Sequence, residues 1–224
     1  MKNKTKLTLF ATLILGSVSL NGAEETSLEG SVSTKYTSDY ARRGALLSDE
    51  AMQASVGFAT DVSGFDVFGD FQTNQSTGSS GADTDELTLG VGTSFMDNLL
   101  NASFGVYNTD HSLADSSLEG FVSIALNTTL SPRVSFYQDT DESLQTFEGG
   151  LSYSSDLNVA ELSIDGVLGS TDTITTDGQT YTGLSAQLAK NVNDDLNIFT
   201  DLSVSDAESR DYETLWGVGL NISF

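Results

Sequence analysis

The sequence contains no cysteine, one proline (Pro132) and one histidine (His111). Without cysteine, disulfides cannot support the fold, as they often do in small exported domains. Proline lacks the backbone N–H that a sheet needs, so its scarcity suits a chain that is mostly paired strand. Disordered chains favour proline and contain few aromatic residues, whereas this one has 12 Phe and 7 Tyr. The composition therefore predicts a folded chain that is stable without covalent cross-links.

Basic residues are also scarce, with 9 Lys and Arg against 32 Asp and Glu. Three of the nine are Lys2, Lys4 and Lys6, and no Lys or Arg occurs from Gly44 to Pro132. Nucleic-acid binding depends on a basic surface that neutralises phosphates. The charge balance excludes nucleic acid as a partner.

Long hydrophobic runs are missing too. The apolar run Leu7–Leu15 has about nine residues, whereas a membrane-spanning helix needs roughly twenty. It follows the three N-terminal lysines and precedes small residues that end at Ala23, the arrangement of a secretory signal peptide. We predict a cleaved signal peptide at 1–23 and one exported domain at 24–224, which is one domain by length.

What the chain does have is alternation. Leu87, Leu89 and Val91 alternate with Glu86 and Thr88, and such a period of two indicates strands that separate two environments. We predict twelve such strands, near 27–37, 50–60, 64–73, 85–95, 99–108, 117–127, 132–138, 145–154, 158–169, 180–190, 195–205 and 211–224. Short turns alternate with longer acidic loops, including 38–49 and 206–210, as in barrels with both ends in the periplasm. The predicted fold is all-β, a transmembrane antiparallel up-and-down β-barrel.

The last segment carries the most specific local feature. Its apolar positions include Trp216 and end on Phe224 itself, a pattern that resembles the assembly signal of outer-membrane barrels. The expected partners are the barrel-assembly machinery, outer-membrane lipid and lipopolysaccharide, and the sequence specifies no oligomeric state. A soluble β-sandwich also alternates, but it pairs two apolar faces as a core. Here the second face is Gly, Ser, Asn, Asp and Glu, which favours a wet lumen.

Strand parity predicts which charged residues face that lumen. The acids are Glu29, Asp66, Asp70, Glu86, Glu119, Glu148, Glu161, Asp165, Asp201 and Glu213, and the bases are Lys35 and Arg133. Carboxylate linings favour cations in a pore. Inward bulky side chains narrow the bore, namely Phe121, Tyr137, Phe199 and Leu215.

A motif near the first predicted loop has a family resemblance. The residues Ser38, Asp39, Tyr40, Arg43 and Gly44 match, and Ala51 and Gln53 follow at the expected distance. This pattern resembles the start of the TorF-type porin family of bacterial outer-membrane proteins, although Ala45 and Glu50 depart from it. The resemblance implies a channel-like barrel and no particular substrate. Physically, Gly44 permits positive φ, and Arg43 can pair with Asp39 or a lumen acid; a loop fold-back without a role in transport is the alternative.

No residue set predicts catalysis, a cofactor or a metal site. A Ser-His-acid triad needs a histidine beside its nucleophile, and we expect His111 to lie in a solvated loop. The acidic runs 139–142 and 206–208 do not have calcium-loop spacing. The sequence favours a passive, narrow outer-membrane channel for cations or small neutral solutes. The alternative is a structural or adhesive barrel with a plugged lumen and acidic loops outside.

Overall fold

The chain folds into twelve antiparallel strands, as the alternation predicts. The computed structural model describes residues 28–79, 81–112, 116–141, 144–172, 179–208 and 210–224. The predicted signal peptide at 1–23 lies outside these residues. The strands are β1 (Leu28–Arg42), β2 (Ala45–Val62), β3 (Phe65–Ser76), β4 (Thr84–Phe95), β5 (Leu100–His111), β6 (Ser117–Leu126), β7 (Arg133–Asp139), β8 (Gln145–Asp156), β9 (Glu161–Thr171), β10 (Gln179–Asn191), β11 (Leu196–Ala207) and β12 (Arg210–Ser223).

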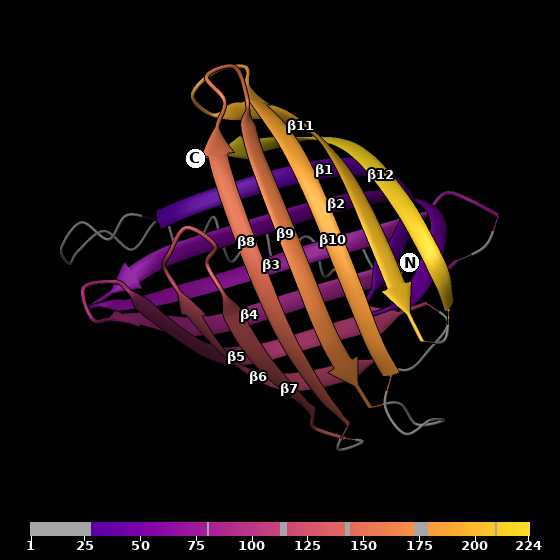
Figure 1. Cartoon of the computed structure of the whole chain (residues 1–224), viewed down its shortest axis with the longest axis horizontal. Helices are drawn as coiled ribbons and strands as arrows, with labels where there is room; N and C mark the ends of the chain where they lie inside the picture. The colour runs from indigo at the N-terminus through magenta and orange to yellow at the C-terminus, as the bar shows by residue number, and fades with distance from the viewer. Residues whose placement is uncertain (1–27, 80, 113–115, 142–143, 173–178, 209) are drawn as a thin grey trace.

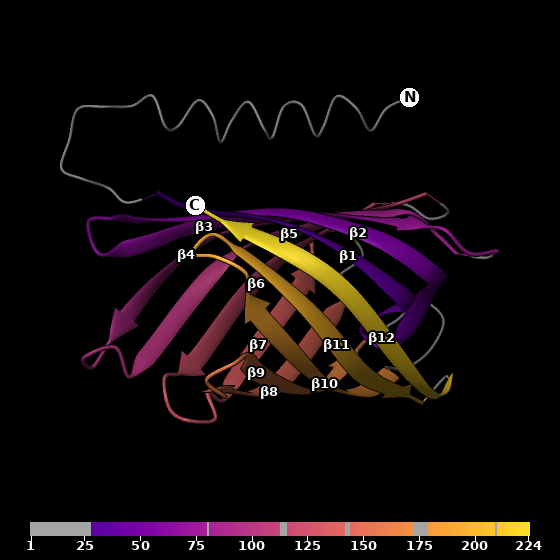
Figure 2. The same cartoon turned by 90° about the horizontal axis from the view of Figure 1, so that it is seen from above.

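The strands close into a barrel (Figures 1 and 2). Each strand pairs with its neighbours in sequence, and β12 pairs with β1 to complete the ring. At the seam, Gly30 and Phe224 exchange both backbone hydrogen bonds, at 2.8 and 2.9 Å. Within the regular sheet, closure leaves no strand edge unpaired, which is the condition for crossing a membrane with strands. Among the residues described, no helix is long and apolar enough to cross a membrane.

Large apolar side chains cover the outside of the barrel. Val122, Leu168, Leu184 and Trp216 are each at least half exposed, which would be unfavourable in water but suits a surface in contact with lipid. The residues that point the other way along each strand are mostly polar or small. The barrel therefore has an apolar exterior and a polar interior, the reverse of a soluble domain.

Two predicted loops prove to be tight hairpins instead. The prediction of a loop at 38–49 is wrong, because β1 continues to Arg42 and β2 begins at Ala45. Arg43 and Gly44 form the connection with φ of 45° and 78°, as in the two-residue turns that suit twisted hairpins. Likewise, β11 reaches Ala207 and β12 begins at Arg210, so 206–210 is mostly strand.

Candidate functional site in the barrel lumen

The β1–β2 hairpin bends into the barrel because both of its strands are irregular. The pairing shifts register between Tyr40 and Ala41, and Glu50 on the partner strand has a φ of 61°. Such bulges bend and twist the strand that carries them. The tip then lies against the opposite side of the barrel seam: a Cβ on Gly44 would sit 2.8 Å from the Cβ of Ala207. Only glycine fits this contact with its positive φ.

The segment between β3 and β4 holds the hairpin in this position. The N–H of Thr77 donates to the carbonyl of Glu50 at 3.0 Å, and the N–H of Ala82 donates to the carbonyl of Leu47 at 2.9 Å. These bonds lie on the part of β2 that extends beyond the regular sheet. The hairpin is therefore anchored on its outer side as well as at its tip.

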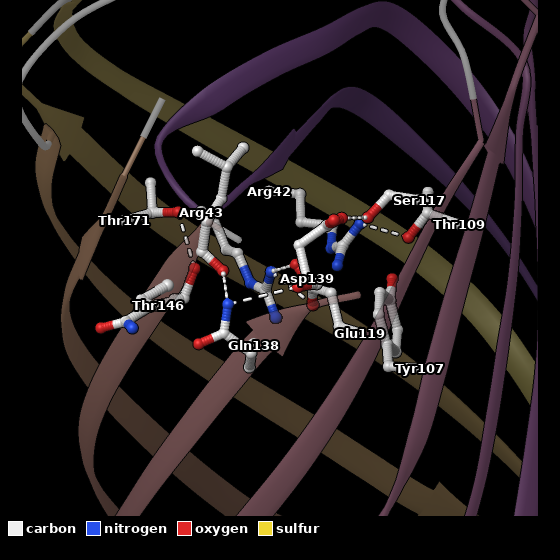
Figure 3. A network of polar contacts seen from close by, with 12 residues as sticks. Arg42, Arg43, Tyr107, Thr109, Ser117, Glu119, Gln138, Asp139, Thr146 and Thr171 are labelled. Atoms are coloured by element: carbon white, nitrogen blue, oxygen red, sulfur yellow. Dashed lines mark hydrogen bonds and ion pairs between the residues drawn. The ribbon is translucent and has the colours of Figure 1, made fainter. Parts of the chain in front are cut away.

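Arg42 reaches from the hairpin to the wall formed by β4 and β5 (Figure 3). Its Nη1 donates to the hydroxyl of Thr109 at 2.9 Å, and its guanidinium lies 4.3 Å from the centre of the Tyr107 ring. Its Nε is 4.0 Å from a carboxylate oxygen of Glu86. Glu86 also accepts hydrogen bonds from the hydroxyls of Tyr40 and, at 2.5 Å, Tyr107. The carboxylate of Glu86 thus connects the hairpin to the wall of the barrel.

Arg43 reaches a different part of the wall, on β6 to β8 (Figure 3). Its Nη1 donates to both oxygens of Glu119, at 2.7 and 2.8 Å, and the two side chains are only 16% and 13% exposed. Its Nε lies 4.0 Å from Glu148, and its guanidinium lies 4.3 Å from the centre of the Tyr137 ring. Tyr181 in turn donates to Glu148 at 2.5 Å. Together, Arg42, Arg43 and these partners form what we call the arginine constriction.

Two further ion pairs lie along the wall of the lumen, and each spans one intervening strand. Arg133 binds Asp165 through two hydrogen bonds, at 2.7 and 3.0 Å, and Ser152 donates to the same carboxylate at 2.9 Å. Lys35 pairs with Asp201 at 3.1 Å and closes over the β1–β12 seam. Every basic side chain described in the lumen is therefore bound to a carboxylate.

The cross-strand register places all ten predicted acids on the inner face of the barrel. They form two groups. The paired acids each form an ion pair with a lysine or arginine side chain: Glu86, Glu119, Glu148, Asp165 and Asp201. The unpaired acids have no ion pair among the described residues and are Glu29, Asp66, Asp70, Glu161 and Glu213. The two predicted lumen bases become four, because Arg42 and Arg43 enter the lumen instead of an outside loop. Two acids join the ten, because Asp39 lines the cavity beside Arg42 and Asp139 stands opposite Glu119 on the inner face.

The lumen is hollow on both sides of the hairpin. A cavity of about 630 Å³ is lined by Arg42, Arg43 and Arg133 together with serines of several strands. It also contacts Phe121, Tyr137 and Leu215, three of the predicted bulky residues, while Phe199 packs over Gly219. A second cavity of about 400 Å³ lies beside Arg42 and Lys35, and a third of about 570 Å³ lies at the end that holds Glu29 and Phe224.

The motif residues have structural roles in the same hairpin. The hydroxyl of Ser38 accepts the N–H of Trp216 at 3.1 Å, and Asp39 lines the cavity beside Arg42. Tyr40 binds Glu86, and Gly44 forms the tip. The carboxylates that Arg43 reaches are Glu119 and Glu148, so of the two predicted alternatives the structure contains the lumen acid and not Asp39.

The two predicted assembly-signal residues are Trp216, which lies on β12, and Phe224, which directly follows it. Trp216 faces outward and packs on Tyr36 with ring centres 5.7 Å apart. Phe224 is 62% exposed, and its ring lies over Gly30, where a Cβ would collide with it. Both residues thus pack against β1, the strand whose pairing with β12 closes the barrel.

Sequence reasoning missed Arg42 as a lumen residue and misplaced His111. The signal for Arg42 is that two adjacent arginines beside a glycine are unusual in so acidic a chain. His111 is the last residue of β5 and pairs with Thr84, so it is not in a loop. The hydroxyl of the neighbouring Ser112 accepts the N–H of Asp83 at 3.0 Å, which is a structural contact. Within the described residues, no three His, Asp or Glu side chains are placed to hold a metal ion.

Comparison with known proteins identifies the fold. No protein-family model and no curated protein matches the sequence. Among solved structures, the KdgM porin is 13% identical with a TM-score of 0.58, over 87% of this chain and 99% of that one. The COG4313 outer membrane channel from Pseudomonas putida F1 is 10% identical with a TM-score of 0.58, over 91% and 97% of the two chains. Outer membrane phospholipase A from Escherichia coli is 13% identical with a TM-score of 0.52, over 87% and 92%. At these identities the likeness shows the fold alone: the chain folds as an outer-membrane β-barrel.

Proposed function

We propose that this protein is a porin-like channel of the outer membrane, through which small solutes and ions diffuse passively. The observation that carries the proposal is a closed barrel with an apolar exterior and a hollow interior lined by charged residues and serines. Interiors of narrow barrels are filled by side chains, whereas wider barrels leave a channel. The motif from Ser38 to Gly44 and its resemblance to TorF-type porins agree with this proposal.

The lumen favours cations over anions. Of its four bases, Lys35, Arg43 and Arg133 donate hydrogen bonds to a carboxylate and Arg42 lies 4.0 Å from Glu86, so the charge of each base is offset by a neighbouring acid. The unpaired acids, among them Asp66, Asp70 and Glu161, leave an excess of negative charge. Because carboxylate linings attract positive ions, we propose small cations and neutral polar molecules as the solutes.

The solute of a structural neighbour does not carry over. One KdgM structure is a complex with disordered oligogalacturonate, whose sugar-acid units each carry a negative charge. An excess of fixed carboxylates repels such a chain electrostatically. The shared fold therefore does not extend to a shared solute.

Two other functions are weaker. The infolded hairpin favours a barrel with a plugged lumen and a structural or adhesive role, because it occupies space that a wide pore would leave open. An enzyme is possible on this fold, since phospholipase A has it, but the contacts of His111 and Ser112 described above give no nucleophile and base pair. We therefore propose a channel whose bore the hairpin narrows.

Single-channel recording on the refolded full chain in a planar bilayer tests the proposal. We expect discrete conductance steps from protein that shows the heat-modifiable migration of a folded barrel. The control is the same preparation after heat denaturation, which should give none. Folded barrel that inserts without conducting would contradict the channel and support the plugged barrel.

A further inference from the structure

We propose that Arg42 and Arg43 form the selectivity filter of this channel: they narrow its bore and offset the charge of the carboxylates around them, so that small cations and neutral polar solutes pass without being held. This inference rests on the proposed channel function and adds the residues that determine what passes. Both arginines lie at the end of a hairpin that leaves the barrel wall, so they are placed within the path and not along its edge.

The two guanidinium groups extend across the lumen to different walls. Arg42 binds Thr109 on β5 and lies near Glu86 on β4, whereas Arg43 binds Glu119 on β6 and lies near Glu148 on β8. Because the hairpin is formed by β1 and β2, these contacts join strands around much of the barrel circumference. Solutes that pass this level have to pass beside the two side chains.

The partners of the guanidinium groups determine which solutes they accept. Both oxygens of Glu119 are within hydrogen-bond distance of Arg43, and the ring of Tyr137 covers its face. An anion that approaches this guanidinium also meets the negative charge of Glu119 and, 4.0 Å from the Nε of Arg43, of Glu148. The arginines thus offset the charge of Glu86, Glu119 and Glu148 without creating an anion site.

The arginine constriction and the rest of the lumen therefore differ in charge. Near Asp66, Asp70 and Glu161 the carboxylates are unpaired, so cations gather there. At the arginine constriction the charges nearly cancel, so cations pass without being held. Conduction requires such a balance, in which binding is favourable enough for entry and weak enough for exit.

Charge substitutions distinguish this filter from a general effect of lumen charge. Arg42→Gln and Arg43→Gln each remove one positive charge from side chains that extend across the lumen, and Lys35→Gln removes one that is also ion-paired but lies along the wall, next to Asp201. Lys190→Gln removes one from the exposed end of β10, next to its short turn to β11. Narrow passages with low-dielectric walls focus the field of fixed charges. We therefore expect the arginine variants to shift the reversal potential further than the two lysine variants, towards the value for a pore that passes cations only.

Substitutions that shorten the two arginine side chains test whether these side chains limit the width of the pore. Arg42→Ala/Arg43→Ala should raise single-channel conductance and let larger neutral polyethylene glycols enter from one side, relative to Lys35→Ala. Arg43→Lys keeps the charge and should keep most of the wild-type selectivity. If the double alanine variant does not fold, as judged by heat-modifiable migration, the single Arg42→Ala variant keeps the Arg43–Glu119 pair and provides the same comparison.

The outcomes separate the inference from the function on which it rests. A conducting wild type with the expected arginine shifts supports both. A conducting wild type in which Lys35→Gln acts as strongly as the arginine variants, with unchanged solute exclusion, overturns the filter and leaves the channel intact. Absence of conductance in every folded variant, the double alanine variant included, overturns the channel proposal itself and the filter with it.

Discussion

The charged side chains of the lumen are held to very different degrees. Arg43 and Glu119 share two short hydrogen bonds and are mostly buried, whereas Asp66 is exposed to the lumen and has no ion pair among the described residues. A charged group that loses its partner while it stays buried must give up both solvent and counter-charge. The lumen acids should therefore differ in what they contribute to stability, although they carry the same charge.

Glu119→Gln tests this difference. The substitution leaves the Arg43 guanidinium buried without its bidentate partner, and we expect it to cost about 1–3 kcal/mol in the free energy of unfolding. Asp66→Asn removes the same charge from an unpaired position and should cost little. Urea unfolding of both variants in lipid vesicles measures the difference. Equal stabilities would show that the Arg43–Glu119 pair contributes nothing net.

The hairpin and the regular strands differ in how far the sequence predicts them. Strands in contact with lipid must be apolar on one face, so their alternation and the inward parity of acids such as Asp165 can be read directly. Residues 38–49 leave the wall, so the regular alternation stops there, and apart from Ala45 to Leu47 most of them are polar, as in a loop. The pairing of Arg43 with Glu119 joins residues 76 positions apart, and no local pattern specifies such a contact. Composition there indicates a turn at Gly44 but not the direction in which it points.

Gly44→Ala tests whether the hairpin must dock as observed. Gly44 and Gly64 both have positive φ, at 78° and 85°, so alanine at either position should cost about 1–2 kcal/mol from backbone strain. Only Gly44 is crowded, since a Cβ there would lie 2.8 Å from that of Ala207, whereas nothing lies within 4 Å at Gly64. We expect Gly44→Ala alone to change single-channel conductance. The same change in Gly64→Ala would mean that strain, and not docking, is responsible.

Phe224→Ala tests the role of the terminal strand in assembly. Phe224 and Phe104 are both 62% exposed, so alanine at either removes a similar lipid-facing ring. Phe224 also covers Gly30 at the seam between β1 and β12, and closure of that seam completes the barrel. We expect Phe224→Ala to reduce sharply the amount of folded protein in outer membranes, measured by heat-modifiable migration, and Phe104→Ala to have little effect. Similar levels for the two variants would exclude a special role for the terminal residue.

At the scale of the whole molecule, closure and charge distribution determine the function that we propose. The apolar exterior confines the charged residues to the lumen, and β1 and β12 seal it without an open edge. The four lumen bases offset only part of the acid charge. The net field inside the barrel should therefore come from the unpaired acids and not from the pairs at the arginine constriction.

This field predicts cation selectivity that depends on the unpaired acids and on salt. In the triple variant Asp66→Asn/Asp70→Asn/Glu161→Gln, the reversal potential across a salt gradient should fall towards zero. The control variant Asp141→Asn/Asp172→Asn/Glu208→Gln removes the same charge from exposed positions in the connections between strands and should keep most of the selectivity. Because the Debye length falls from about 10 Å at 0.1 M to about 3 Å at 1 M, the wild-type preference should weaken as salt rises. Anion selectivity in the wild type, or equal effects of the two triple variants, would show that the unpaired acids do not set the field of the lumen.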